Sequence, residues 1–164
     1  MFALRIRLCV LSLLLLFCLC GCEAKEKYFA PLDGAFVADV EGTYGEIAFS
    51  ARLCVDAPCK GEAVRRATLI FYAPSALKGT TLCRDADGAL SLSVGDLVVS
   101  APEAYGALFS FLEARDVSSV MREGENARVV CKESSFLFAK DGTPLEATGG
   151  SVSVKILSFS KNEG

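Results

Sequence analysis

Apolar and polar side chains alternate strictly along much of this chain, and that alternation restricts its possible folds more than any other feature. The longest example spans residues 47–55, where small or polar residues separate Ile47, Phe49, Ala51, Leu53 and Val55. Successive side chains of a β-strand point to opposite faces, so this pattern predicts a strand with one buried face. Similar, shorter stretches recur along the chain, which predicts a mainly β protein.

Short turns join the predicted strands. The pairs Asp87-Gly88 and Asp141-Gly142 are typical of tight hairpins. Short connections between successive strands favour an antiparallel meander over parallel crossover units. About eight or nine strands are expected, at residues 36–41, 47–55, 64–72, 82–86, 89–94, 96–100, 127–132, 135–139 and 152–159.

One segment has helical periodicity instead. Ser100-Ala101-Pro102-Glu103 resembles a capping box, with Ser100 as the cap. Helical spacing then relates Ala104, Leu108, Phe111 and Leu112, and Arg115 would lie in the last turn. We therefore expect an α+β fold, a curved antiparallel sheet or incomplete barrel packed on one amphipathic helix. A β-sandwich is the competing architecture.

The N-terminus has the features of an export signal. Arg5 and Arg7 precede an almost unbroken apolar run at residues 8–20, which is too short to span a bilayer. The following Leu19-Cys20-Gly21-Cys22 resembles the bacterial lipobox, in which the final Cys becomes lipidated. This resemblance implies a signal peptide at 1–21 and lipidation of Cys22. An ordinary secreted protein or a short uncleaved anchor are the alternatives.

This interpretation divides the chain into three parts. Residues 1–21 are the leader, residues 22–33 are the lipidated Cys and a tether, and residues 34–164 form one domain. No helix is predicted between Lys27 and Gly34. The lipid on Cys22 would hold the protein on the extracytoplasmic face of the cell membrane.

The composition argues against several classes of function. The chain contains no His, which excludes Ser-His-Asp and Cys-His catalysis and His-ligated metal sites. A formal charge of −3 argues against a nucleic-acid partner. The sequence has no phosphate-binding loop, nucleophile elbow or metal-ligand cluster. We therefore expect no cofactor, no metal, no catalytic residue and no enzymatic activity. The basic pair Arg65-Arg66 is expected at a sheet edge or on a solvent-exposed face.

Four cysteines follow Cys22 in the chain, namely Cys54, Cys59, Cys83 and Cys131. An exported compartment permits disulfides. Cys54 and Cys59 flank a short turn and could form one bridge, which would leave Cys83 and Cys131 for a second. Buried free thiols are the alternative.

The chain contains eleven Phe, several of them in the predicted strands and helix. They can fill the core or line a cavity for an acyl chain, and the sequence does not separate the two. The candidate pocket residues are Phe49, Leu53, Leu69, Phe71, Leu108 and Phe111.

Several segments resemble the LolA/LolB/LppX-type lipoprotein-carrier superfamily over residues 34–159. They are Phe36-Val37-Ala38-Asp39-Val40 with the strand through Val55, Leu69-Ile70-Phe71 running into Pro74-Ser75-Ala76-Leu77-Lys78-Gly79-Thr80, and Asp141-Gly142-Thr143-Pro144. The resemblance implies an incomplete, strongly curved barrel covered by helices, with acyl chains bound between them.

Together these features predict a membrane-anchored, non-enzymatic envelope lipoprotein that binds a lipid or another hydrophobic ligand between sheet and helix. The alternative is a solid scaffold that presents a protein-binding surface at the cell envelope. No particular protein partner is indicated.

Overall fold

The computed structural model describes residues 28–161, so the predicted leader and Cys22 lie outside the described residues. Eleven antiparallel strands form one open sheet, with a 3₁₀ helix, η1, between β6 and β7. The strands are β1 Phe36–Tyr44, β2 Ile47–Val55, β3 Ala67–Ala73, β4 Thr80–Arg84, β5 Leu90–Val94, β6 Leu97–Ser100, β7 Val117–Glu123, β8 Asn126–Cys131, β9 Ser134–Phe138, β10 Pro144–Gly149 and β11 Val152–Lys161, and η1 spans Glu103–Leu112.

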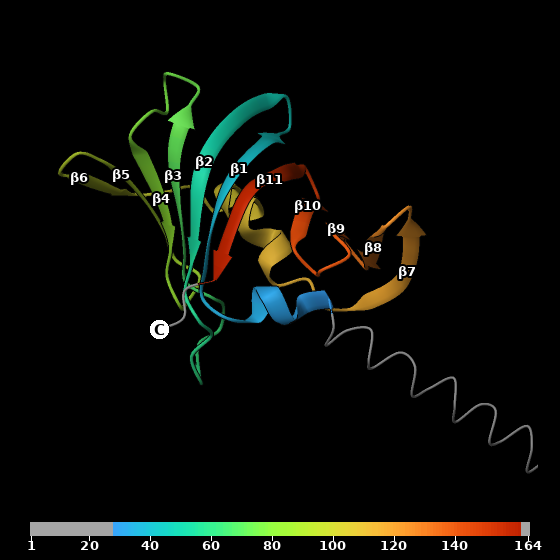
Figure 1. Cartoon of the computed structure of the whole chain (residues 1–164). Helices are drawn as coiled ribbons and strands as arrows, with labels where there is room; N and C mark the ends of the chain where they lie inside the picture. Colours follow the sequence, from blue (N-terminus) through green and yellow to red (C-terminus); the bar gives the residue numbers. More distant parts are fainter. Residues whose placement is uncertain (1–27, 162–164) are drawn as a thin grey trace, which may run out of the picture.

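The strand order is β6-β5-β4-β3-β2-β1-β11-β10-β9-β8-β7. Every neighbouring pair of described strands is consecutive in sequence except β1 and β11, which meet in the middle of the sheet. The sheet curves around η1, and the first described residues cross one end of it (Figure 1). The expected curved, unclosed antiparallel sheet is therefore present.

The concave face of the sheet carries the core. Cross-strand neighbours on this face form a row in which Ala38, Leu53, Leu69 and Leu82 oppose one another across β1 to β4. All four side chains are at most 3% exposed. Alternate residues of these strands face solvent on the convex side, as the alternation in the sequence predicts.

The helical segment forms as expected, but its details differ. It is a 3₁₀ helix that begins after Pro102 without a side-chain cap, and Arg115 follows it instead of lying in its last turn. The expected cap, Ser100, is the last residue of β6 and pairs with Ser91 of β5. Sheet pairing therefore takes the residue that the capping pattern indicated. Leu108 and Phe111 of η1 are buried against the sheet.

Residues 28–33, expected to belong to the tether, form a short helix. Phe29 and Leu32 are buried at 1% and 5% exposure. The Phe29 ring packs edge-on against Phe136 and Phe138, with centroid distances of 5.0 and 5.6 Å. This helix is part of the folded domain because its apolar face covers the end of the core.

Two strands were missed by the pattern. In β7 every residue after Val117 is exposed, so the strand has no buried face to produce an apolar alternation. In β10 the first residue is Pro144, and a register irregularity between Pro144 and Glu146 interrupts the alternation. These two strands account for the difference between the predicted count and the observed sheet.

Candidate functional site

An apolar pocket lies between η1 and strands β2 to β5. Its volume is about 160 Å³. Its lining contains no charged side chain and consists of Tyr44, Ile47, Phe49, Phe71, Leu77, Leu82, Leu92, Tyr105 and Leu108. Such a lining favours an apolar ligand over a polar one.

A hydrogen bond, a pair of aromatic rings and a glycine shape the space between the sheet and η1. The Tyr44 hydroxyl donates a hydrogen bond to the Ala104 carbonyl at 3.0 Å and so fixes the first turn of η1. Phe49 and Phe71 meet edge-to-face at 5.9 Å on the floor. Opposite Phe49 in β1 stands Gly42, where an added Cβ would lie 3.0 Å from the Phe49 ring. The missing side chain therefore leaves room for the ring.

The floor of the pocket continues to the edge of the sheet. Leu82 opposes Leu92 in β5, and Leu92 in turn opposes Val99 in β6. One pair along, Val94 opposes Leu97. We call Leu92, Val94, Leu97 and Val99 the apolar shelf. Val94, Leu97 and Val99 are 55%, 65% and 46% exposed. The row of core side chains that runs across the concave face therefore ends in residues exposed to solvent.

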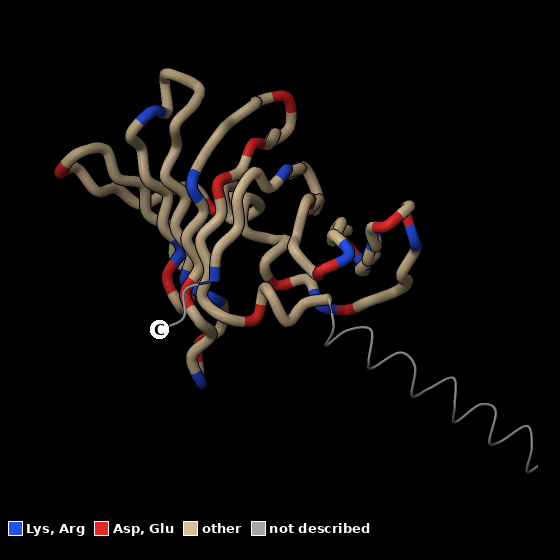
Figure 2. Tube along the Cα trace, viewed as in Figure 1, with Lys and Arg blue, Asp and Glu red and all other residues tan. Residues whose placement is uncertain are grey.

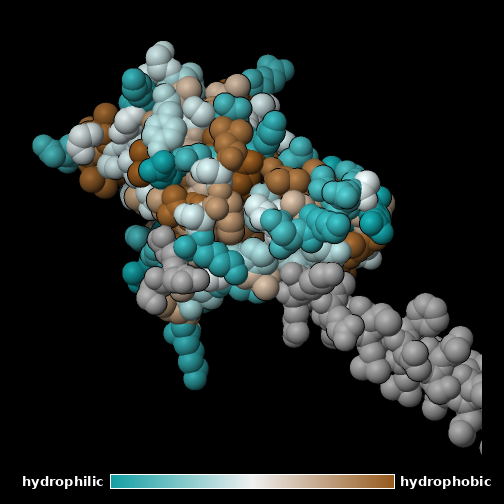
Figure 3. All heavy atoms as spheres, viewed as in Figure 1, coloured by the Kyte–Doolittle hydropathy of each residue, from teal (hydrophilic) through white to brown (hydrophobic). Residues whose placement is uncertain are grey.

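The distribution of hydrophobic and charged residues over the molecule agrees with an apolar shelf on the β5–β6 hairpin. Hydrophobic surface is visible at the end of the β5–β6 hairpin (Figure 3). The same hairpin carries one charged position, at its tip, whereas charges gather at the other end of these strands and around β7 and β8 (Figure 2). That tip residue is Asp96. The shelf is thus an uncharged apolar surface continuous with the pocket.

Three of the six predicted pocket residues, Phe49, Phe71 and Leu108, line this pocket. The other three, Leu53, Leu69 and Phe111, are buried elsewhere in the core. Sequence reasoning missed Leu82 and Leu92. The cross-strand register places Leu82 opposite Leu69 and Leu92 opposite Leu82, and it could have indicated both residues. That register depends on where each turn ends, and the turn residues alone do not determine it.

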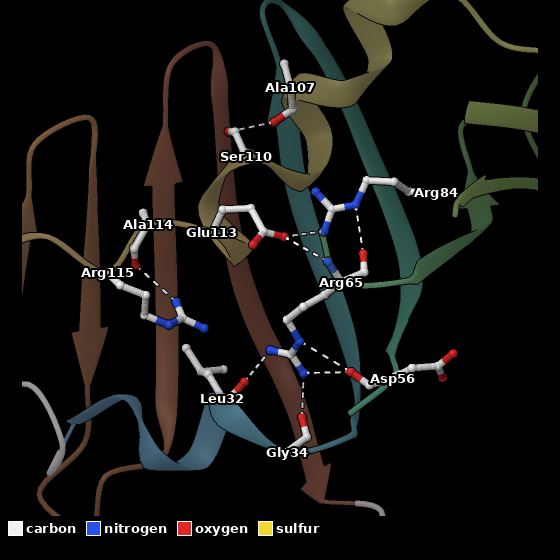
Figure 4. Close-up of polar contacts among 10 residues, drawn as sticks. All are labelled: Leu32, Gly34, Asp56, Arg65, Arg84, Ala107, Ser110, Glu113, Ala114 and Arg115. Carbon is white, nitrogen blue, oxygen red and sulfur yellow. Dashed lines mark hydrogen bonds and ion pairs between the residues drawn. The ribbon is translucent and has the colours of Figure 1, made fainter. Parts of the chain in front are cut away.

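A second cluster lies at the opposite end of β2 and consists of three arginines, of which two are buried and one is partly buried (Figure 4). The prediction that Arg65 lies at a solvent-exposed edge is wrong, because its side chain is 7% exposed. Its guanidinium donates to the carbonyls of Leu32, Gly34 (2.6 Å) and Asp56 (2.9 Å). Arg65 therefore holds the end of the 28–33 helix against the sheet and pairs with carbonyls that the helix leaves unbonded.

Arg84 and Arg115 complete the cluster. Arg84 donates to Glu113 Oε1 at 2.7 Å and to the Arg65 carbonyl at 3.0 Å. Arg115 lies 4.8 Å from the centre of the Phe29 ring and 3.7 Å from Asp33. Burial lowers the pKa of all three guanidinium groups below the ordinary arginine value. Through these contacts the three arginines join the 28–33 helix, β4 and the residues after η1.

The four cysteines lie in different surroundings. Cys54 and Cys83 flank Thr68 in the register, so one whole strand separates them. Cys59 is exposed in the loop after β2, and Cys131 is buried in β8. No disulfide joins them within residues 28–161. Burial raises the pKa of the Cys54 thiol. A Cys54–Cys59 bridge stays a prediction.

Two further observations concern the described part of the chain only. Over residues 28–161, no group of three or more His, Cys, Asp or Glu side chains is arranged to hold a metal ion. No helix in the same range is both long and apolar enough to cross a bilayer.

Comparison with solved structures identifies the fold. An uncharacterized conserved protein from Thermus thermophilus matches with a TM-score of 0.55 at 15% identity, over 87% of each chain. An outer membrane lipoprotein-sorting protein domain from Vibrio parahaemolyticus matches with a TM-score of 0.43 at 10% identity, over 86% of this chain and 91% of its own. A LolA superfamily protein from Nitrosomonas europaea matches with a TM-score of 0.39 at 6% identity, over 86% and 91% respectively.

No protein-family model and no curated protein sequence matches this chain. The likeness to the Thermus thermophilus protein shows a shared fold. The resemblance to the LolA/LolB/LppX-type superfamily stays a prediction from the sequence. At these identities the likeness concerns the fold alone.

Proposed function

We propose that this protein is a lipid-anchored envelope protein that binds an acyl chain or a similar apolar ligand in the pocket and along the apolar shelf. One observation carries the proposal: a single cross-strand row, Leu69–Leu82–Leu92–Val99, runs from the closed core through the pocket to an exposed edge. Apolar side chains exposed to water cost free energy, and a core that only had to be filled would not need them at the edge of the sheet. Exposed apolar patches of this kind are typical of binding sites.

The size of the site favours an elongated ligand. The pocket of about 160 Å³ lies below the usual range of about 300–1,000 Å³ for small-molecule sites. A chain that enters the pocket with one end and lies along the shelf with the rest would cover Val94, Leu97 and Val99. Each buried methylene contributes about 0.8 kcal/mol, so a few methylenes in the pocket already give measurable affinity.

Localisation belongs to the same proposal. The lipobox-like Leu19-Cys20-Gly21-Cys22 supports lipidation at Cys22 and a position on the extracytoplasmic face of the membrane. The proposed role is non-enzymatic. Glu113, Asp39 and Glu123 each form an ion pair with an arginine, which supports a structural use of these carboxylates over an acid–base one.

Native mass spectrometry of residues 23–164, exported without the lipid anchor, tests ligand binding, and organic extraction identifies what is released. We expect an adduct of lipid mass on the unsubstituted protein. Leu92→Glu, which places a carboxylate on the pocket floor, should lose it. Ser93→Glu on the opposite face of the same strand is the matched control and should keep it. A bare mass together with failure to bind added fatty acid would contradict the proposal.

The scaffold alternative has one observation in its favour, the exposed edge strand β6. Recovery of one stoichiometric envelope protein, without lipid, in a pulldown would favour that alternative.

A further inference from the structure

The two edge strands of the open sheet differ in the residues that would discourage pairing with a further strand. Among the described strands, β6 and β7 each have a neighbour on one side only. The edge strand β7 carries Arg122 and Glu123 and has a register irregularity after Val117, features that discourage edge-to-edge pairing. The strand β6 reads Leu97-Val98-Val99-Ser100, is exposed throughout and has no charge, proline or bulge. The β6 edge is therefore left open to another strand.

The main-chain groups that are open on β6 can be identified. The Ala101 N–H donates to the Leu90 carbonyl at 2.9 Å. Hydrogen-bonded pairs alternate along an antiparallel ladder, so the next such pairs are Leu92 with Val99 and Val94 with Leu97. The N–H and C=O of Val98 must then point away from β5. The same holds for Ser100, two positions further along β6.

We propose that β6 pairs antiparallel with β6 of a second copy of this chain, about a twofold axis that passes beside Val98. In this register the two Val98 residues form a hydrogen-bonded pair, which is the pair that their outward main-chain groups can make. Asp96, in the turn before β6, then lies near Ser100 of the other copy. The contact is isologous, so every group on one copy meets its complement on the other.

The position of the single charge on the hairpin, and the face on which its apolar side chains lie, favour a second copy of this chain as the partner of β6. The one charged residue of the hairpin, Asp96, lies opposite Ser100, so the two Asp96 residues are about 13 Å apart along the strands. That separation exceeds the screening length of about 8–10 Å in physiological salt. The uncharged strand therefore opposes itself without repulsion.

The pairing also joins the two apolar shelves. Residues directly opposite in an antiparallel pair point to the same face, so Val99 of one copy meets Leu97 of the other on the concave side. The row Leu82–Leu92–Val99 then continues into Leu97 and Val94 of the second copy. Each exposed shelf is extended by its partner. A contact of this length is small, so the dimer should dissociate on dilution.

Cysteine cross-linking of the full chain in the membranes of an expressing bacterium tests the contact. Val98→Cys is placed in a Cys59→Ser background, which removes the one exposed thiol among residues 28–161. With a short bifunctional thiol reagent we expect a cross-linked species of twice the monomer mass. Val120→Cys on β7, also on an edge and 40% exposed, is the matched control and should stay monomeric. Equal cross-linking of both variants, no dimer from Val98→Cys, or a product with a different protein would each overturn the proposal.

Three further substitutions of Val98 test the main-chain pairing between the two copies of β6. Val98→Pro deletes an N–H that points away from β5, whereas Val98→Thr keeps both the N–H and the branched shape. Sedimentation over a range of concentrations should show dimer loss for Val98→Pro and retention for Val98→Thr. Val98→Lys, which opposes two like charges at the axis, should also lose the dimer. Persistence of the dimer in Val98→Lys would overturn the proposal.

These results are independent of ligand binding. Val98 opposes Ser93, on the face of the hairpin away from the shelf, so its variants leave the pocket floor intact. Loss of the lipid adduct in Leu92→Glu with an intact dimer, or the reverse, tells the two proposals apart.

Discussion

Arg84 and Glu113 are joined by a 2.7 Å ion pair, in which the arginine side chain is 6% exposed and the glutamate side chain 41% exposed. The pair fastens β4 to the residue that follows η1. Glu113 Oε1 also accepts a hydrogen bond from the Arg65 main-chain N–H at 3.4 Å. One carboxylate oxygen thus accepts from both buried arginines, from the side chain of Arg84 and from the main chain of Arg65.

Replacing Glu113 should therefore destabilise the domain. Glu113→Ala leaves the buried Arg84 guanidinium without its carboxylate, and hydrogen bonds to charged groups contribute about 1.5–3 kcal/mol. We expect a loss of about 2 kcal/mol in the free energy of unfolding by urea titration. The control is Glu103→Ala, an exposed acid in the first turn of η1. A loss for Glu113→Ala no larger than that of the control would contradict the assigned role.

Arg65→Met tests the attachment of the 28–33 helix. The substitution leaves the carbonyls of Leu32, Gly34 and Asp56 without their donor, which should cost about 3 kcal/mol. Amide hydrogen exchange should speed up first over residues 28–35. Arg66→Met is a closely matched control because the Arg66 side chain is 57% exposed. Unchanged exchange in that segment for Arg65→Met would show that other contacts hold the helix.

Gly42→Ala tests the close approach beneath the pocket. An added Cβ would lie 2.4 Å from the Ser153 carbonyl oxygen and 2.9 Å from a Val154 methyl group. Overpacking of this kind costs about 1–3 kcal/mol, so we expect a lower melting temperature and a displaced Phe49 ring. Gly34→Ala is the control, because nothing lies within 4 Å of its added Cβ. Equal melting temperatures for the two variants would be incompatible with the contact.

Asp39 should contribute to stability in a pH-dependent way. Hydrogen bonds from Arg52 and Ser158 hold its pKa below the ordinary aspartate value. A lowered pKa in the folded state gives stability that is present above the unfolded pKa of about 3.9 and is lost as the pH falls through the folded pKa. The pair is exposed, so its contribution at neutral pH is small, about 0.2–1 kcal/mol.

Asp39→Asn measures this contribution directly. Urea titrations at neutral pH should show the variant to be less stable, and the difference should disappear at a pH below the lowered pKa of Asp39. Glu41→Gln, two residues along the same exposed face, serves as the control. A difference that persists unchanged into acid would assign the effect to something other than ionisation of Asp39.

The sequence predicted those strands in which buried and exposed side chains alternate regularly. In β2 the alternation of Phe49, Ala51 and Leu53 is a direct consequence of one face being covered, and the structure has that strand with the predicted bounds. The hairpins at Asp87-Gly88 and Asp141-Gly142 also formed where their turn residues indicated. Gly88 and Gly142 have φ values of 90° and 87°, which only glycine adopts without strain.

The elements that were missed depend on tertiary contacts. Strand β7 is exposed on both faces, so its pairing with β8 and not burial defines it. The burial of Arg65 depends on three carbonyls from residues 9 to 33 positions away in the chain. Three of the six candidate residues line the pocket. Leu82 and Leu92 join it through the register of β4 with β5, and register depends on where each turn ends.

The central pairing of β1 with β11 has a consequence for how this chain can be rearranged. Phe36 of β1 lies beside Lys161 of β11, so the first and the last strand of the sheet are neighbours although nine strands separate them in the sequence. A circular permutant that links residue 161 to residue 28, and so keeps the 28–33 helix, and that opens the chain near η1 would place the strands in the order β7 through β11 and then β1 to β6. Every strand would then pair with its neighbour in sequence. Folding speeds up as contacts become more local, so the permuted chain should reach the same sheet faster.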